Sequence, residues 1–248
     1  MPIVLIATTN PGKLREYAHL FETVPGVRVV SPNDVEIWVE VAETGDTLAE
    51  NALLKARALY YALLEQTGQH DDGRWTMDDR GKDTGSTDPS SIVHRPSSAE
   101  GRVPRPLSAA GWWVLGDDSG LEVDAMGGAP GVHSNRWAGP NTTAADRNRL
   151  LLERLEGVPD EERTARFRCV VALISPTGEE YVTEGTVEGR IAHEPKGSGG
   201  FGYDPLFVLP DGRRMSELTP DEKNLLSHRG IAGAKAAAII FAAPGLSG

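Results

Sequence analysis

A buried strand followed at once by two acids is the feature that most limits how this chain can fold. The apolar run at 112–115 (Trp-Trp-Val-Leu) ends abruptly in Gly116-Asp117-Asp118-Ser119-Gly120. Such runs are typical of buried strands, and open α/β sheets place their ligand crevices at the carboxyl ends of strands. Aspartate oxygens suit Mg²⁺, which commonly accompanies phosphates. The motif therefore favours metal-assisted chemistry on a phosphorylated substrate, although Asp-Asp-Ser-Gly is also typical of a turn.

The composition excludes several classes of protein. The chain has 248 residues, 39% of them hydrophobic and 25% charged, as is ordinary for a globular protein. Its net charge of −11 argues against a broad nucleic-acid surface. No apolar run reaches the roughly 20 residues that span a bilayer, and the N-terminus lacks the basic region of a signal peptide. We therefore expect a protein that acts on a small molecule, with no nucleic-acid or membrane partner.

The single cysteine gives an expectation about the compartment. Cys169 cannot form an internal disulfide, which fits the reducing conditions of the cytoplasm. Because it lies in an apolar run, we expect a packed strand thiol rather than a nucleophile. The chain is accordingly expected to be cytoplasmic.

Apolar runs alternate with capped helical patterns, which predicts a mixed α/β fold. Strands are expected at Ile3–Ala7, 27–30 and 112–115, and a hairpin at 165–175 and 180–188 around the turn 176–178. Helices are expected after five N-cap residues, namely Asn10, Thr47, Thr143, Thr219 and Ser227.

The character of the sequence changes between the second helix and the strand at 112–115. Residues 67–110 are dominated by Gly, Ser, Thr, Asp, Pro and Arg, with few apolar anchors. We predict a single domain over 1–248 that is interrupted by a disordered or flexible insertion at 67–110. We favour an inert insertion; the alternatives are that it covers a cleft, affects dimerisation or recruits a partner.

Two clusters carry chemistry in the first quarter of the chain. Residues Thr8 to Lys13 follow a strand and open a helix, so backbone N–H groups and a lysine can face an anion. Asn51 and Lys55 are four residues apart and share one helix face, with Glu43 upstream. That face either lines a cleft, with Lys55 on phosphate and Glu43 on metal, or is an ordinary solvated helix side.

Two further clusters lie in the last quarter. Residues 199–205 (Gly-Gly-Phe-Gly-Tyr-Asp-Pro) combine glycines, a stacking ring and the acceptor Asp204, which are parts for recognising a base. Lys223, His228 and Arg229 lie near a helix start, where they could neutralise phosphate or reach a purine carbonyl. Each cluster also has a structural interpretation, as core aromatics or solvated charges.

The four clusters match one family when taken together. The chain closely resembles the inosine triphosphate pyrophosphatase family, also called Ham1-like. The resemblance covers nearly everything except 66–110. It rests on motifs that occur in the family's order: Ala7-Thr8-Thr9-Asn10-Pro11-Gly12-Lys13, Glu50-Asn51-Ala52, Asp117-Asp118-Ser119-Gly120-Leu121, Gly127-Gly128-Ala129-Pro130-Gly131, Phe201-Gly202-Tyr203-Asp204-Pro205 and Ser227-His228-Arg229.

The resemblance implies an elongated mixed α/β sheet flanked by helices, with two lobes around a central nucleotide cleft and commonly a homodimer. It implies Mg²⁺-dependent hydrolysis of a nucleoside triphosphate to the monophosphate and pyrophosphate. The implied substrates are ITP, dITP and XTP, which the enzyme would clear from the nucleotide pool.

The resemblance also implies a role for each matched residue. Asp118 corresponds to the proton acceptor and metal-site carboxylate, and Glu43 is the expected second metal ligand. Asp118, alone or with Asp117, would orient or deprotonate the water that attacks the α-phosphorus. Substrate contacts are implied for Thr8, Thr9, Asn10, Pro11, Gly12 and Lys13 on the triphosphate, Lys55 on phosphate, Ser119, and Phe201, Gly202, Tyr203, Asp204, Lys223, His228 and Arg229 around the base and sugar-phosphate.

One departure and two alternatives complete the expectations. Gly116 stands where the family often has alanine, and because both residues are small we expect this departure to be harmless. A Maf-like pyrophosphatase of pyrimidine or modified nucleotides is disfavoured by His228-Arg229 and by the motif at 201–204. A nucleotide sensor without turnover is disfavoured by the intact acids and Lys13.

Overall fold

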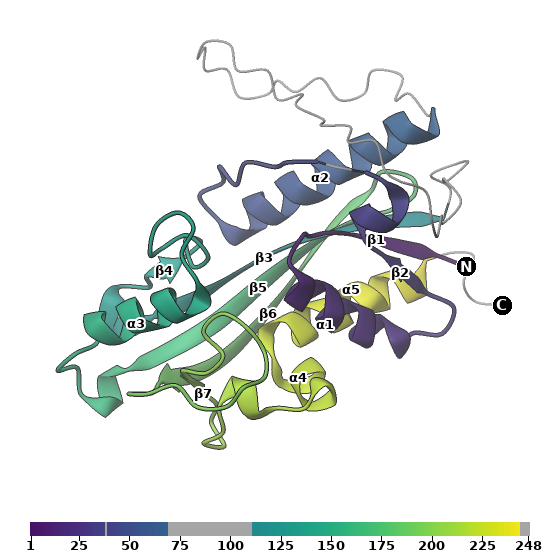
Figure 1. Ribbon diagram of the computed structural model, residues 1–248. Helices are drawn as coiled ribbons and strands as arrows, with labels where there is room; N and C mark the ends of the chain where they lie inside the picture. Colours follow the sequence, from purple (N-terminus) through teal and green to yellow (C-terminus); the bar gives the residue numbers. More distant parts are fainter. Residues whose placement is uncertain (38, 69–110, 244–248) are drawn as a thin grey trace, which may run out of the picture.

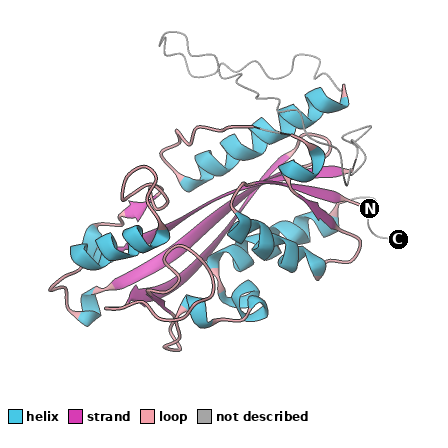
Figure 2. Cartoon of the chain, viewed as in Figure 1, coloured by secondary structure: helices cyan, strands magenta, loops and turns pink. Residues whose placement is uncertain are grey.

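The computed structural model describes residues 1–37, 39–68 and 111–243. Within them, seven strands form one mixed sheet in the order β2-β1-β3-β5-β6-β7, and β4 pairs with β3 (Figure 1, Figure 2). The strands are β1 Ile3–Ala7, β2 Arg28–Val30, β3 Trp112–Val123, β4 Pro130–Gly131, β5 Thr164–Ile174, β6 Glu180–Ile191 and β7 Phe207–Val208. The pairs β1·β2 and β1·β3 are parallel, and the others are antiparallel.

All five predicted N-caps are confirmed. The Asn10 side chain accepts hydrogen bonds from two backbone amides of the first turn, Thr47, Thr143 and Thr219 form capping boxes, and Ser227 accepts from the Gly230 amide. The helices that they open are α1 Pro11–Glu22, α2 Leu48–Thr67, α3 Ala144–Arg154, α4 Pro220–Leu226 and α5 His228–Ala242.

The predicted end of the third strand is wrong. β3 does not stop at Leu115 but runs on to Val123, so Asp117 and Asp118 lie in the middle of a strand. Its parallel partner β1 ends opposite Gly116, yet β5 continues to pair with β3 as far as Val123. Because this antiparallel ladder satisfies the backbone beyond Gly116, no turn forms there.

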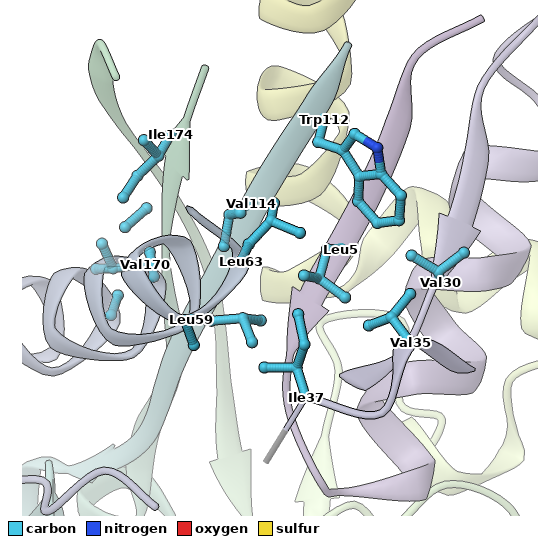
Figure 3. Close-up of a cluster of buried hydrophobic side chains, with 14 of the residues drawn as sticks. Leu5, Val30, Val35, Ile37, Leu59, Leu63, Trp112, Val114, Val170 and Ile174 are labelled. Atoms are coloured by element: carbon cyan, nitrogen blue, oxygen red, sulfur yellow. The ribbon is translucent and has the colours of Figure 1, made fainter. Parts of the chain in front are cut away.

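Helices cover both faces of the sheet around β1 and β3. α2 packs on one face over a cluster that includes Leu5, Val114 and Val170 (Figure 3). α1 and α5 cover the other face, where Tyr17 and Phe21 meet the buried strand residue Cys169. The predicted packed thiol is thus confirmed.

A third apolar cluster lies at the opposite end of the sheet. It joins the ends of β3 and β5 to α3 and β7. The predicted hairpin is also confirmed, since β5 and β6 pair along their whole length around the turn at 176–178. These elements form the second lobe of the mixed α/β fold.

Gly116 is not interchangeable with alanine in this packing. A Cβ atom there would lie 2.5 Å from the Ala52 carbonyl oxygen and 2.7 Å from the Ala56 nitrogen. Both are backbone atoms of α2, so the helix would have to move away from β3. Glycine at this position lets α2 approach the strand at backbone distance, and the expected harmlessness of the departure stays a prediction.

The predicted insertion at 67–110 falls almost entirely at 69–110, outside the described residues. Its disorder, and the single-domain boundaries that depend on it, stay predictions. Among the residues that the structure describes, no helix is long and apolar enough to cross a membrane.

Candidate active site

A cleft of about 430 Å³ lies where β1 ends and β3 continues. Its walls come from the loop after β1, the segment before α2, α2 itself, the middle of β3, the turn after β4, α3, residues 201–204 and the start of α5. Because β1 stops opposite Gly116, the acids that follow Gly116 on β3 have no parallel neighbour strand beside them. The cleft occupies that position and brings both lobes to the same carboxylates.

Asp117 is the buried anionic centre of the site. Its Oδ2 atom lies 2.9 Å from Lys13 Nζ and 3.3 Å from Arg229 Nε. Burial acts to raise the pKa of Asp117, but the charges of Lys13, Arg229 and Lys55 outweigh it and hold that pKa well below its usual value. Asp117 is therefore ionised and ties α1 and α5 to β3.

Asp118 points to the opposite face of β3, toward α2. Its Oδ1 atom accepts a hydrogen bond from Lys55 Nζ at 2.8 Å, and its Oδ2 atom accepts one from Asn51 Nδ2 at 3.4 Å. Burial raises the pKa of Asp118 above its usual value, although Lys55 opposes the shift. Lys55 thus lines the cleft, while Asn51 on the same helix face is fully buried, so this face is not a solvated side.

Lys55 joins two carboxylates. Its Nζ atom lies 2.6 Å from Glu43 Oε1 and 2.8 Å from Asp118 Oδ1, and it also donates to the Asp117 carbonyl oxygen at 3.2 Å. Glu43 and Asp118 therefore converge on one point at the cleft wall, although 75 positions separate them in the sequence.

This donor set fits a magnesium ion. Mg²⁺ is usually held by one or two carboxylates together with substrate phosphates and water, rather than by a cage of protein ligands. Glu43 and Asp118 supply two converging carboxylates, and no group of three or more His, Cys, Asp or Glu side chains that could hold a metal occurs in the described part of the chain. Both residues remain candidate ligands.

The N-terminus of α1 contributes less free backbone than the sequence indicated. The N–H groups of Gly12 and Lys13 donate to Asn10 Oδ1, at 2.8 and 3.3 Å. Thr8, Thr9, Asn10 and Lys13 line the cleft. The helix start therefore offers side chains and its dipole to an anion, while Asn10 satisfies two of its amides.

The Phe201 ring closes one side of the cleft against a buried ionic cluster. Lys223 Nζ and the Arg229 guanidinium lie 4.9 and 5.3 Å from its centroid, in cation–π geometry. Asp204 Oδ2 accepts from both Lys223 Nζ and the Phe201 amide, at 2.7 and 2.8 Å. These contacts fix the ring and the carboxylate relative to each other.

His228 and Arg229 are both nearly inaccessible to solvent. The His228 ring stacks on Phe167 with centroids 4.7 Å apart. Burial, reinforced by the Arg229 and Lys223 charges, lowers the pKa of His228 well below its usual value, so the ring is neutral. Arg229 donates to Ser119 Oγ at 2.8 Å and to Glu16 Oε2 at 2.6 Å.

Most of the residues singled out in the sequence meet at this cleft. Pro11, Gly12 and Lys223 do not form its wall: Lys223 lies behind Phe201, and Gly12 packs under the same ring. The residues that do line it are Thr8, Thr9, Asn10, Lys13, Glu43, Lys55, Asp118, Ser119, Phe201, Gly202, Tyr203, Asp204, His228 and Arg229.

Sequence reasoning missed Glu16. Its carboxylate bridges Lys223 Nζ and Arg229 Nη1, each at 2.6 Å, and so joins α1 to both C-terminal helices. Burial acts to raise the pKa of Glu16, but Arg229 and Lys223 together lower it. The available signal was its position three residues after Lys13, which puts both side chains on one side of α1.

Comparison with protein families identifies one model that matches most of the chain. It describes the Ham1 family and matches residues 4–81 and 99–239. Among curated relatives, a dITP/XTP pyrophosphatase of Geobacillus kaustophilus is 43% identical over 230 residues, which are 92% of this chain and 89% of that protein. A dITP/XTP pyrophosphatase of Bacillus subtilis is 36% identical over 230 residues, 92% of each chain.

Solved structures agree with these relatives. A HAM1 protein from Coxiella burnetii superposes with a TM-score of 0.69 at 32% identity, covering 98% of this chain and 100% of the other. A nucleoside-triphosphatase / dITP/XTP pyrophosphatase from Mycobacterium abscessus has a TM-score of 0.59 at 38% identity, covering 96% of this chain and 97% of the other.

Proposed function

The chain belongs to the Ham1 family, and from that premise we propose that it hydrolyses non-standard purine nucleoside triphosphates to the monophosphate and pyrophosphate. The substrates are ITP, dITP and XTP, and the reaction removes them from the nucleotide pool. The observation that carries the proposal is the placement of Asp118 in a cleft with Lys13 and Lys55 on its wall. The cleft thus combines a carboxylate that can accept a proton from water with two cations that can bind phosphate oxygens.

In this proposal the triphosphate lies between α1 and α2. Lys13 and Lys55 neutralise phosphate oxygens, and the dipole of α1 adds positive potential near Thr8, Thr9 and Asn10. In the free protein both lysines contact aspartates on β3. These contacts hold the ammonium groups in place before substrate arrives, which lowers the cost of ordering them.

Asp118 is the proton acceptor in the reaction. A water oxygen bonds to the α-phosphorus as the bond from that phosphorus to the bridging oxygen breaks, and the electron pair leaves with pyrophosphate. Asp118 accepts the proton of the water at a carboxylate oxygen, and the raised pKa of its buried carboxyl suits this role. Asp117 stays ionised and positions Lys13 and Arg229.

Glu43 and Asp118 would hold Mg²⁺, and their convergence on Lys55 Nζ supports this assignment. When bound, the ion supplies charge neutralisation on the triphosphate and the leaving pyrophosphate. Lys55 Nζ lies between these two carboxylates at the cleft wall, where it would also face a phosphate oxygen of the substrate.

Selection of the base is assigned to the wall formed by residues 201–204 and His228. The Phe201 ring offers a stacking surface, and Lys223 and the Phe201 amide hold Asp204 rigid. A rigid polar site that pairs with a 6-keto purine leaves buried partners unsatisfied when adenine enters, which costs binding of ATP.

Product analysis with five nucleotides tests the proposal. ITP, XTP, GTP, ATP and dTTP are incubated with Mg²⁺, and monophosphate, diphosphate, pyrophosphate and phosphate are resolved. IMP or XMP with pyrophosphate, and little product from the other three, is the expected result. Preferential cleavage of dTTP would favour a Maf-like enzyme, diphosphate with phosphate would refute attack at the α-phosphorus, and binding without turnover would favour a sensor.

We further propose that the protein is a cytoplasmic homodimer that acts on a small molecule and binds no nucleic acid. The family resemblance supports the dimer, and the reduced, buried Cys169 fits a reducing compartment. Light scattering coupled to size-exclusion chromatography is expected to give twice the 26.6 kDa chain mass.

A further inference from the structure

The segment that carries Glu43 has little regular structure of its own. Residues 39–46 connect a 3₁₀ turn, η1 (Pro32–Val35), to α2 without a helix or strand. At its α2 end, the Gly45 amide donates to Asn51 Oδ1 at 2.8 Å. The Thr44 amide donates to the Ala42 carbonyl oxygen at 3.0 Å, which forms a three-residue turn centred on Glu43. This turn fixes the local backbone, but the direction of the Glu43 carboxylate depends on the contacts of its side chain.

Arg136 makes a two-point contact to Glu43 from the turn after β4. Arg136 Nη1 lies 2.8 Å from Glu43 Oε2, and Nη2 donates to the Glu43 carbonyl oxygen at 3.3 Å. One guanidinium thus holds both the side chain and the main chain of the same residue. This planar two-point contact is one that lysine cannot reproduce.

The turn that presents Arg136 is itself firmly attached. The Arg136 amide donates to the His133 carbonyl oxygen at 2.9 Å. Two residues earlier, Ser134 Oγ accepts from the Leu121 amide of β3 at 2.8 Å, and the Ser134 carbonyl oxygen accepts from Tyr203 at 2.9 Å. Through this turn, Arg136 connects the Glu43 carboxylate to β3 and to Tyr203 on the opposite wall of the cleft.

The two oxygens of Glu43 have different partners. Oε1 lies on the cleft side, 2.6 Å from Lys55 Nζ, whereas Oε2 faces Arg136. A ligand exchange at Oε1 leaves both Arg136 contacts intact. Hydrogen bonds that orient a metal-ligating side chain from behind commonly change metal affinity by about 10- to 100-fold when they are removed.

We propose that Arg136 is a positioning residue that directs Glu43 into the divalent-cation site of the cleft. The proposal rests on the proposed function for its metal, but it concerns how this chain builds the ligand. Arg136 acts through Glu43 and not on the nucleotide.

Binding of Mn²⁺ alone, followed by electron paramagnetic resonance, tests the role without turnover. Arg136→Ala is expected to weaken Mn²⁺ binding about tenfold. Arg136→Lys keeps the charge but loses the two-point contact, so an intermediate affinity is expected. Arg149→Ala is the matched control, because Arg149 forms an exposed ion pair with Glu153 at 3.1 Å on α3, and wild-type affinity is expected.

A double-mutant cycle separates positioning from a general structural effect. In a Glu43→Gln background, Arg136→Ala is expected to change Mn²⁺ affinity less than twofold, because the ligand that Arg136 orients is already gone. In the otherwise native enzyme, Arg136→Ala is expected to raise the half-saturating Mg²⁺ concentration about tenfold. KM for ITP at saturating Mg²⁺ should stay within about twofold.

Unchanged or tighter Mn²⁺ binding in Arg136→Ala would overturn the proposal, the latter by showing that Arg136 competes with the metal. An altered KM with unchanged metal affinity would assign Arg136 to the nucleotide instead. If Arg136→Ala fails to fold, the Arg136→Lys variant tests the proposal by itself. Wild-type Mn²⁺ affinity in that variant would show that the two-point contact does not position Glu43. Failure of the wild type to hydrolyse ITP refutes the proposed function, and the Mn²⁺ measurements remain a separate result.

Discussion

Asp117 and Asp118 are adjacent, yet their carboxylates lie in opposite environments. Successive side chains of a strand point to opposite faces, so Asp117 meets Lys13 and Arg229 while Asp118 meets α2. Surrounding cations keep the pKa of Asp117 low, whereas burial raises that of Asp118. One dipeptide thus supplies a structural anion and the carboxylate that we propose as proton acceptor.

Paired amide substitutions separate these two roles. Asp118→Asn is expected to lower kcat by about 10²- to 10⁴-fold, because the proton acceptor is lost. Its loss of unfolding free energy should not exceed about 2 kcal/mol, because Lys55 keeps Glu43 as a partner. Asp117→Asn leaves Lys13 and Arg229 without their shared carboxylate and should cost about 3–5 kcal/mol.

Urea denaturation and steady-state kinetics on the same preparations give both quantities. The Asp117→Asn variant serves as the stability reference for Asp118→Asn. A fully active Asp118→Asn enzyme, or an Asp117→Asn protein as stable as the wild type, would contradict the assignment.

Cys169 is expected to be unreactive in the folded protein. Burial, with Asp117 nearby, raises the pKa of its thiol to about 12. Because the thiolate is the reacting species, a thiol-specific disulfide reagent at pH 8 should label the native chain at a negligible rate. Since the chain has one cysteine, labelling after denaturation should reach one equivalent. Rapid labelling of the native protein would show that the thiol is accessible.

The contacts of Glu16 and Arg136 could not be predicted from the sequence. The partners of Glu16 lie more than 200 positions away, and Arg136 pairs with a residue 93 positions earlier. Long-range ion pairs leave no local pattern. By contrast, Asp118, Lys13 and Lys55 stood out because their neighbours in sequence already suggested a strand edge or a helix face.

At the scale of elements, the contact between α2 and β3 depends on Gly116. Gly116→Ala is expected to destabilise the protein by about 1–3 kcal/mol, because its Cβ would force backbone atoms of α2 away from the strand. Urea denaturation measures this loss. ITP hydrolysis should fall as well, since Asn51 and Lys55 on α2 would shift relative to Asp118.

Gly233→Ala is the matched control for that substitution. Its Cβ would meet Leu20 Cδ1 at 2.9 Å, at the movable end of a side chain rather than at backbone. Alanine is also favoured over glycine in a helix interior by about 1 kcal/mol, so stability should change little. Equal losses in the two variants would show that the position of the α2 backbone is not the cause.

Helix starts were predictable and strand ends were not, for one physical reason. A cap is a local hydrogen bond between a side chain and amides two or three residues later, so Thr47, Thr143 and Thr219 could be identified directly. The length of β3 depends on β5, whose paired residues lie about 40 to 60 positions further along the chain. Asp-Asp-Ser-Gly has turn chemistry, but the ladder overrides it.

At the scale of the molecule, Glu16 joins α1 to α4 and α5 and makes the fold sensitive to acid. Its pKa is lowered in the folded state, so its contribution to stability is present above the ordinary glutamate pKa and is lost as pH falls through the folded value. The difference in unfolding free energy between wild type and Glu16→Gln should therefore be largest near pH 7. It should shrink below about pH 4.

Chemical denaturation of both proteins between pH 7 and pH 3 measures this difference. Asp118 shares no ion-pair partner with Glu16, so its contribution cancels between the two proteins, whereas Asp204 shares Lys223 with Glu16 and contributes to the measured difference. A difference that stays constant or grows at low pH would mean that Glu16 is not held ionised by Lys223 and Arg229.

The α/β class and the meeting of distant motifs at one cleft could be predicted, because the motif set resembles one family. The strand order could not be read from periodicity. β3 lies beside β1 although more than 100 residues separate their starts, and the antiparallel half of the sheet follows it. The Ham1 relatives support the same arrangement across both lobes.

Asp117 and Asp118 are fixed in the middle of a 12-residue strand, whereas Glu43, Phe201 and Tyr203 come from irregular segments around the cleft. The proposed proton acceptor and the ring proposed to stack on the base thus lie on different kinds of structure, whereas the proposed metal ligand Glu43 lies, like the ring, on an irregular segment. Substitutions at Phe201 and Tyr203 are therefore expected to change which nucleotide is accepted while Asp117 and Asp118 keep their positions on β3.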